Sequence, residues 1–128
     1  MGIMNIIIPL VLFPYDVMFS FDEENEILLS TLSDTGVKFD KEDIEQSFGK
    51  CRTSLFEGNQ TLIRLPFIPS TPFEFSILSH EIFHATEFII KRLMRIHLSG
   101  KTDEVYAYTI QYLTEAIYEE LPQFKNPL

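Results

Sequence analysis

The stretch SHEIFH, residues 79–84, lies inside a long apolar segment and decides how the rest of the chain is interpreted. His80 and His84 are four residues apart, so on an α-helix they share one face and lie about 5–6 Å apart. Two imidazoles placed in this way can bind one metal ion at about 2.0–2.1 Å. Glu81 is rotated by about 100° from His80, so its carboxylate would lie beside the ion and could act as general base on a metal-bound water. The stretch therefore predicts a helix with a zinc site.

The residues before this stretch indicate where the helix begins. In STPFE, residues 70–74, Thr71 is a suitable N-cap, Pro72 fits the first helical position and Glu74 completes a capping box. The pattern stays helical and apolar to Met94. Four phenylalanines of the segment are expected in the core: Phe73, Phe75, Phe83 and Phe88.

The remaining pattern places strands first and long helices last. This order is typical of an α+β domain, and we expect a single domain over residues 1–128. Apolar and β-branched runs predict strands, turn residues predict a hairpin, and capping residues predict helices. The predicted elements are strands at 4–13 and 15–21, a helix of about three turns within 22–33, a helix at 41–48 capped by Asp40 and ended by Gly49, a hairpin at 51–66 with its turn at Gly58-Asn59, and a helix from Thr102 to Leu121 before Pro122.

Composition limits the function classes. The chain has 128 residues, of which 45% are hydrophobic and 13% aromatic, as expected for a packed core. Its net charge of −9 offers no basic surface for nucleic acid or an anionic membrane. The single cysteine, Cys51, excludes an internal disulfide and is expected to be a small buried residue. The apolar run at residues 1–13 lacks a basic start and a cleavage site, and is shorter than the roughly 20 residues that span a bilayer. We therefore expect a soluble intracellular protein.

A catalytic zinc needs a third protein ligand, and Glu104 is the candidate. If the helix ran to Leu98, its end would lie about 21 Å beyond His84, and residues 99–103 could return only about 17 Å. If it ended near Met94, its end would lie about 15 Å out, and residues 95–101 could return about 23 Å. The alternating pattern at 95–98 favours the second case, with 95–98 extended.

Each candidate also has a simpler interpretation. Glu104 could only stabilise a helix N-terminus, and Glu81 could lie on a solvated face. Tyr108 and Tyr112 follow Glu104 on its helix face, where their hydroxyls could orient a ligand or bind an oxyanion, or where both could be core residues. His97 is expected to be a surface residue.

The motifs HEIFHA (80–85) and DEVYAY (103–108) together resemble the gluzincins, zinc peptidases with two histidines and one glutamate as ligands. The resemblance is closest to small zincin-like proteins of tailed bacteriophages and covers residues 79–121. It implies a small zincin-like domain in which His80, His84 and Glu104 bind Zn²⁺ and Glu81 is catalytic. Asp103 replaces the Asn of thermolysin-like members, and Tyr108 replaces a later acidic residue.

The resemblance leaves more than one function open. The first is zinc-dependent hydrolysis of peptide bonds, with an extended peptide or protein substrate pairing along a strand edge at Thr61–Pro66. The second is a virion or morphogenesis protein that uses the fold as a scaffold and has other phage structural proteins as partners. A third is a regulatory peptidase that cleaves one repressor-like partner. These functions imply a protein of the host cytoplasm or the virion.

Overall fold

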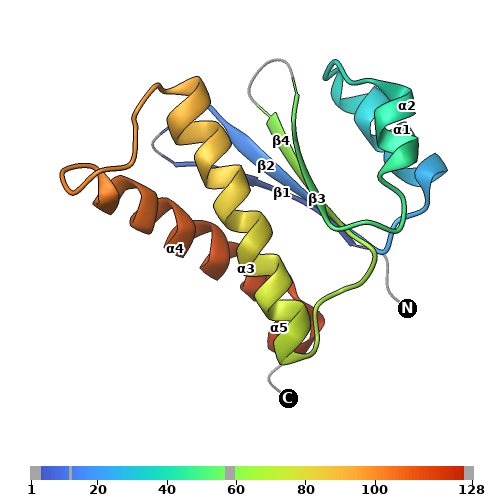
Figure 1. The fold of residues 1–128 in the computed structure, drawn as a ribbon. Coiled ribbons are helices and arrows are strands. Elements are labelled where there is room, and N and C mark those ends of the chain that lie inside the picture. The colour runs from blue at the N-terminus through green and yellow to red at the C-terminus, as the bar shows by residue number, and fades with distance from the viewer. Residues whose placement is uncertain (1–3, 12, 57–59, 126–128) are drawn as a thin grey trace. The chain divides into compact units, whose positions relative to one another are not determined.

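The computed structural model describes residues 4–11, 13–56 and 60–125, and the chain divides into two compact units, Met1–Ile68 and Pro69–Leu128. The first unit contains a four-stranded sheet and two helices, and the second contains only helices in its described part (Figure 1). The expected α+β class is therefore confirmed. None of the described helices combines the length and the apolar character needed to cross a membrane.

The sheet of the first unit has the strand order β1-β2-β4-β3. Its strands are β1 (Met4–Pro9), β2 (Asp16–Phe21), β3 (Arg52–Leu55) and β4 (Gln60–Leu65). β1 pairs antiparallel with β2, and β3 pairs antiparallel with β4, so the predicted hairpin is confirmed. Its predicted turn at Gly58-Asn59 lies outside the described residues.

The prediction that Thr61–Pro66 forms an open strand edge is wrong. β4 pairs in parallel with β2 on one side and antiparallel with β3 on the other. Its backbone N–H and C=O groups are therefore used in two ladders, and every residue of the strand is buried. Among the described strands, β1 and β3 form the edges of the sheet.

Two short helices follow β2 and pack on one face of the sheet. α1 spans Asn25–Thr35, about three turns as predicted, and α2 spans Lys41–Gln46. The Asp40 side chain accepts hydrogen bonds from the backbone N–H groups of Glu42 and Asp43, so the predicted cap is confirmed. The chain leaves this helix through Gly49 at φ 80°, where a residue without Cβ is favoured. The shared core consists of Met18, Leu28, Leu32, Ile44, Phe56 and Leu62.

A buried arginine ties α2 and the loop after β2 to this face. Arg64 on β4 is 2% exposed, and its guanidinium donates to the carbonyl oxygens of Ile44 and Glu23 and to the Ser47 hydroxyl at 2.8–2.9 Å. Burial lowers the pKa of Arg64, and the nearby charges of Glu23 and Glu24 oppose this effect. The three acceptors depend on Arg64 for these hydrogen bonds, so the side chain is a structural cross-link.

The second unit is built from α3 (Pro72–Glu87), a π-helical continuation η1 (Phe88–Leu93), α4 (Asp103–Glu120) and the short α5 (Pro122–Lys125). Thr71 caps α3 by accepting from the Glu74 N–H, and Pro72 occupies the first turn, as predicted. The Glu74 carboxylate accepts from the Ser70 N–H at 2.9 Å, one residue earlier than a capping box requires. The predicted helix end near Met94 and the predicted span of the last helix are confirmed.

The aromatic residues are less buried than expected. Phe75 packs against Tyr118 of α4 at 4.9 Å between ring centroids, and Tyr118 stacks on Phe124 of α5 at 5.8 Å. Burial raises the pKa of the Tyr118 hydroxyl. Phe73 and Phe83, however, are 73% and 40% exposed. Their assignment to the core is wrong, because they lie on the side of α3 opposite to its buried residues.

Cys51 also differs from its prediction. The residue precedes the edge strand β3, and it is exposed rather than buried. A position just before an edge strand has few neighbours to cover it, and the small apolar character of cysteine does not reveal this.

The two arginines that pair across β3 and β4 provide a test of the buried cross-link. Arg52 and Arg64 are directly opposite each other, but Arg52 forms only a 2.8 Å ion pair with Asp43 in which both side chains are 40% exposed. Arg64→Met should lower the free energy of unfolding by about 3 kcal/mol, because buried acceptors lose a charged donor. Arg52→Met should cost less than about 1 kcal/mol, since exposed ion pairs contribute little. Urea denaturation measures both, and equal losses would contradict the structural role of Arg64.

Candidate metal site on helix α3

The rotation of α3 is set by its apolar residues. Leu78, Ile82, Ala85 and Ile89 are fully buried and recur at intervals of three or four residues, so they form one stripe. At 100° per residue, the centre of the His80/His84 face lies roughly opposite this stripe. His80 is accordingly exposed, and His84 is half-buried.

The two histidines point toward each other, as the sequence predicts. Their Nε2 atoms are 3.1 Å apart, and their ring centroids are 4.7 Å apart in an edge-to-face arrangement. At this separation, an ion bonded to both nitrogens at 2.0–2.1 Å would subtend an N–metal–N angle of about 95–102°, near the tetrahedral value. Without an ion, one Nε2–H donates a hydrogen bond to the other Nε2. Metal binding would therefore replace a shared proton.

Glu81 occupies the boundary between the two faces of α3. It is only 6% exposed, so the interpretation as a solvated surface residue is wrong. Helical geometry places it about 60° from His84 and about 100° from His80 around the axis. It thus stands beside the histidine pair without being part of it, the position that the sequence predicts for a general base.

The segment that returns from α3 to α4 is short but not uniformly extended. Residues 95–98 have no helical or strand pairing, yet Arg95 adopts the left-handed conformation with φ 63°. The prediction of extended backbone is wrong at this residue, because the chain reverses here. The Ile96 N–H bonds back to the Ile90 carbonyl, and the Tyr106 hydroxyl donates to the Ile96 carbonyl at 2.6 Å. These two bonds hold the segment to both helices.

Glu104 lies in the first turn of α4 and is exposed. The buried residues of this helix are Tyr106, Thr109, Leu113 and Ile117. Glu104 precedes Tyr106 by two residues, a rotation of about 200°, which directs it away from that buried stripe. Within residues 4–11, 13–56 and 60–125, no three His, Cys, Asp or Glu side chains lie close enough to share a metal ion. The structure brings His80 and His84 together, and Glu104 as third ligand stays a prediction.

The weaker candidates are placed as follows. Tyr108 is 64% exposed and is not a core residue, whereas Tyr112 is half-buried. His97 is exposed, as predicted, and lines a pocket on the histidine side of α3. The tyrosine that the sequence interpretation missed is Tyr106, which is 3% exposed and fixes the returning segment. The position of Tyr106 on the apolar stripe of α4 would have identified it as a buried residue.

Comparison of the chain with protein-family models, with curated proteins and with solved structures found no match. The histidine pair fits two positions of a tetrahedral zinc site, and the donor set is one protein ligand short of a catalytic centre among the described residues.

Metal binding can be tested one ligand at a time. The zinc-depleted protein should bind one Zn²⁺ in titration calorimetry, and His80→Ala or His84→Ala should weaken binding by more than about 100-fold, since even outer-shell changes cost 10- to 100-fold. His97→Ala is the matched control and should bind as the wild type does. Glu104→Gln should also weaken binding if the third-ligand prediction holds. Unchanged affinity in both single-histidine variants would rule out the pair as a zinc site.

Proposed function

We propose that the chain is a zinc-dependent hydrolase of peptide bonds whose metal is held by His80 and His84. The observation that carries the proposal is the 3.1 Å separation of the two Nε2 atoms on the accessible side of α3. A buried carboxylate, Glu81, stands beside this pair. The resemblance of HEIFHA and DEVYAY to the gluzincins supports the same assignment.

The roles of the residues follow from their positions. A bound zinc ion would lower the pKa of a coordinated water toward 7 and polarise a peptide carbonyl. His80 and His84 hold their Nε2 atoms 3.1 Å apart, and on loss of the shared hydrogen both nitrogens could bind one ion on the outer side of the helix. Glu81 would accept a proton from the attacking water through a carboxylate oxygen and return it to the leaving amine. Glu81 is only 6% exposed, so its carboxylate is largely shielded from bulk solvent.

The third ligand is proposed to be Glu104. The helix end at Met94 leaves a return path of the required length, which supports this assignment. The exposed position of Glu104 means that binding would require its side chain to move toward the histidines.

A second candidate function has its own support. The described residues include no group of three metal ligands, and Glu104 faces away from the buried stripe of α4. A virion or morphogenesis protein that uses this arrangement as a scaffold would need neither a complete site nor a general base. The two functions differ in what they require of Glu81.

The test is the replacement of Glu81 by glutamine. Glu81→Gln keeps the shape of the side chain and removes its basicity, so peptide cleavage should fall by about 10²- to 10⁴-fold, the usual contribution of a positioned general base. Zinc content and melting temperature should change little, because Glu81 is not a ligand. The measurement is cleavage of a quenched-fluorescent peptide library by the zinc-loaded protein.

The control for this experiment is Glu115→Gln, the same change at an exposed position of α4. It should leave cleavage unchanged. Hydrolysis that survives Glu81→Gln would contradict the peptidase mechanism. A wild type that holds zinc and cleaves no member of the library would favour the scaffold function.

A further inference from the structure

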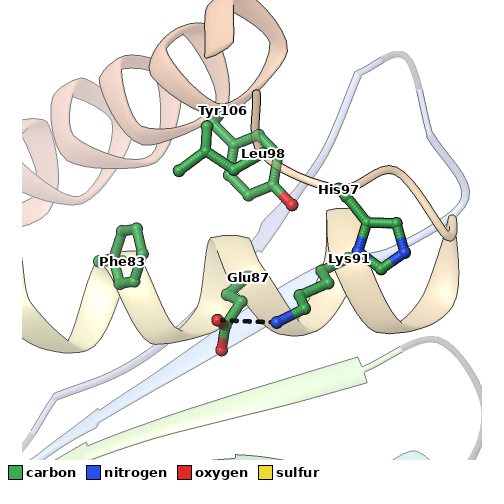
Figure 2. A pocket seen from close by; sticks show the side chains of 6 residues that line it. All are labelled: Phe83, Glu87, Lys91, His97, Leu98 and Tyr106. Atoms are coloured by element: carbon green, nitrogen blue, oxygen red, sulfur yellow. Dashed lines mark ion pairs between the residues drawn. The ribbon is translucent and has the colours of Figure 1, made fainter. Parts of the chain in front are cut away.

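A pocket of about 240 Å³ opens beside the histidine pair, between the outer face of α3, the returning segment and the start of α4 (Figure 2). All of its lining residues belong to the second unit. They are Phe83, Glu87 and Lys91, which follow one another at four-residue intervals along α3 and η1, together with His97, Leu98 and Tyr106.

Phe83 connects the pocket to the candidate metal site. Its ring lines the pocket and also meets the ring of His84 edge-on, with 6.1 Å between the centroids. A peptide residue bound in the pocket would therefore lie next to the residue presented to the histidines.

Half of the lining residues, Phe83, Leu98 and Tyr106, are apolar or aromatic, and the other half are polar. Phe83 and Leu98 are 40% and 55% exposed, which is a large exposure for such side chains. Tyr106 uses its hydroxyl to bond the Ile96 carbonyl, so the atoms it offers to the pocket are mainly ring carbons. The volume lies below the roughly 300–1,000 Å³ typical of whole-ligand sites. The pocket thus suits one large apolar side chain.

The pocket is also lined by one acidic and two basic-type side chains, Glu87, Lys91 and His97. Lys91 and Glu87 form an ion pair at 3.8 Å whose side chains are 47% and 28% exposed, a geometry in which the pair contributes little. Lys91 can therefore donate to a ligand as well. Figure 2 shows His97 on the same side of the pocket as Lys91.

The segment that begins at Lys91 is rich in basic residues, and Asp103 and Glu104 follow it at the start of α4. The protein has ten lysines and arginines, and its net charge is −9. Four of these ten fall within residues 91–101, which contain no acidic residue. All four, Lys91, Arg92, Arg95 and Lys101, are exposed. A basic segment in an acidic protein favours an acidic partner over a basic one.

We propose that this pocket binds a large apolar side chain of an acidic peptide segment, with a neighbouring carboxylate of the peptide paired to Lys91 and His97. The proposal deepens the proposed hydrolase function by naming its substrate class, acidic peptides with a leucine-sized residue beside the cleaved bond. Binding itself needs neither zinc nor the base, because none of the six lining residues is a predicted ligand or Glu81.

The experiment measures peptide binding without catalysis. The full chain carrying Glu81→Gln, free of zinc, is titrated into three fluorescein-labelled peptides of equal length at low and physiological salt. One has glutamates around a central leucine, the second has alanine in place of leucine, and the third has lysines in place of the glutamates. The acidic leucine peptide should bind at least about tenfold more tightly than the other two, because only it satisfies both the apolar and the charged walls.

Two variants assign this binding to the pocket. Lys91→Glu should weaken binding of the acidic leucine peptide by about tenfold or more, whereas Lys125→Glu on α5, with the same change of charge, should not. Leu98→Ser should weaken it without changing the net charge, and circular dichroism verifies that each variant is folded. Equal binding of the basic peptide, no effect of Lys91→Glu and Leu98→Ser, or tighter binding of a single-stranded oligonucleotide would each overturn the proposal.

Failure of the peptide-binding proposal can be distinguished from failure of the proposed hydrolysis. If the acidic peptide binds but the zinc-loaded wild type does not cleave it, the hydrolase function fails and the pocket stands as a docking site for an acidic protein segment. If the wild type cleaves peptides without preference for acidic sequences, the pocket proposal fails and the hydrolase function stands.

Discussion

The opposite arrangement of buried and exposed residues on one helix is the constraint on which the candidate site depends. Burial of Leu78, Ile82, Ala85 and Ile89 sets the rotation of α3. Once this stripe is inside, residues on the opposite face must be accessible, and a spacing of four brings the imidazoles of His80 and His84 to 3.1 Å. Hydrophobic packing of this stripe therefore sets the position of the pair.

The end of the same helix determines what can approach this face. The π-helical turn and the left-handed Arg95 reverse the chain, and the Tyr106 hydroxyl fastens the returning segment to α4. The helix ends near Met94, as predicted from the number of residues needed for a return to Glu104. Chain length does not predict the direction of Glu104. That direction depends on the rotation of α4, which its buried stripe sets.

Local sequence signals predicted individual helices and strands better than they predicted which elements pack or pair with one another. The caps at Asp40 and Thr71 act within a few residues, so the sequence alone identifies them. The parallel pairing of β2 with β4 joins strands about 40 residues apart, as in Phe19 opposite Ile63, and no local pattern encodes it. Because of this pairing, β4 lies in the interior of the sheet and not at its edge. The exposure of Phe83 was missed for a related reason, since a phenylalanine on a largely buried helix is usually counted as core.

The exposure of Phe83 links the histidine pair to the pocket. A phenylalanine at 40% exposure leaves apolar surface in water, which is unfavourable unless a partner covers it. Phe83 and Lys91 lie four residues before and four residues after Glu87 along α3 and η1, and the Phe83 ring meets the His84 ring. A ligand that covers Phe83 would therefore lie next to the His84 ring. The outer side of α3 and η1 thus combines an exposed phenylalanine, an exposed lysine and a pair of histidine nitrogens, and the proposed acidic peptide with one large apolar side chain would meet the first two.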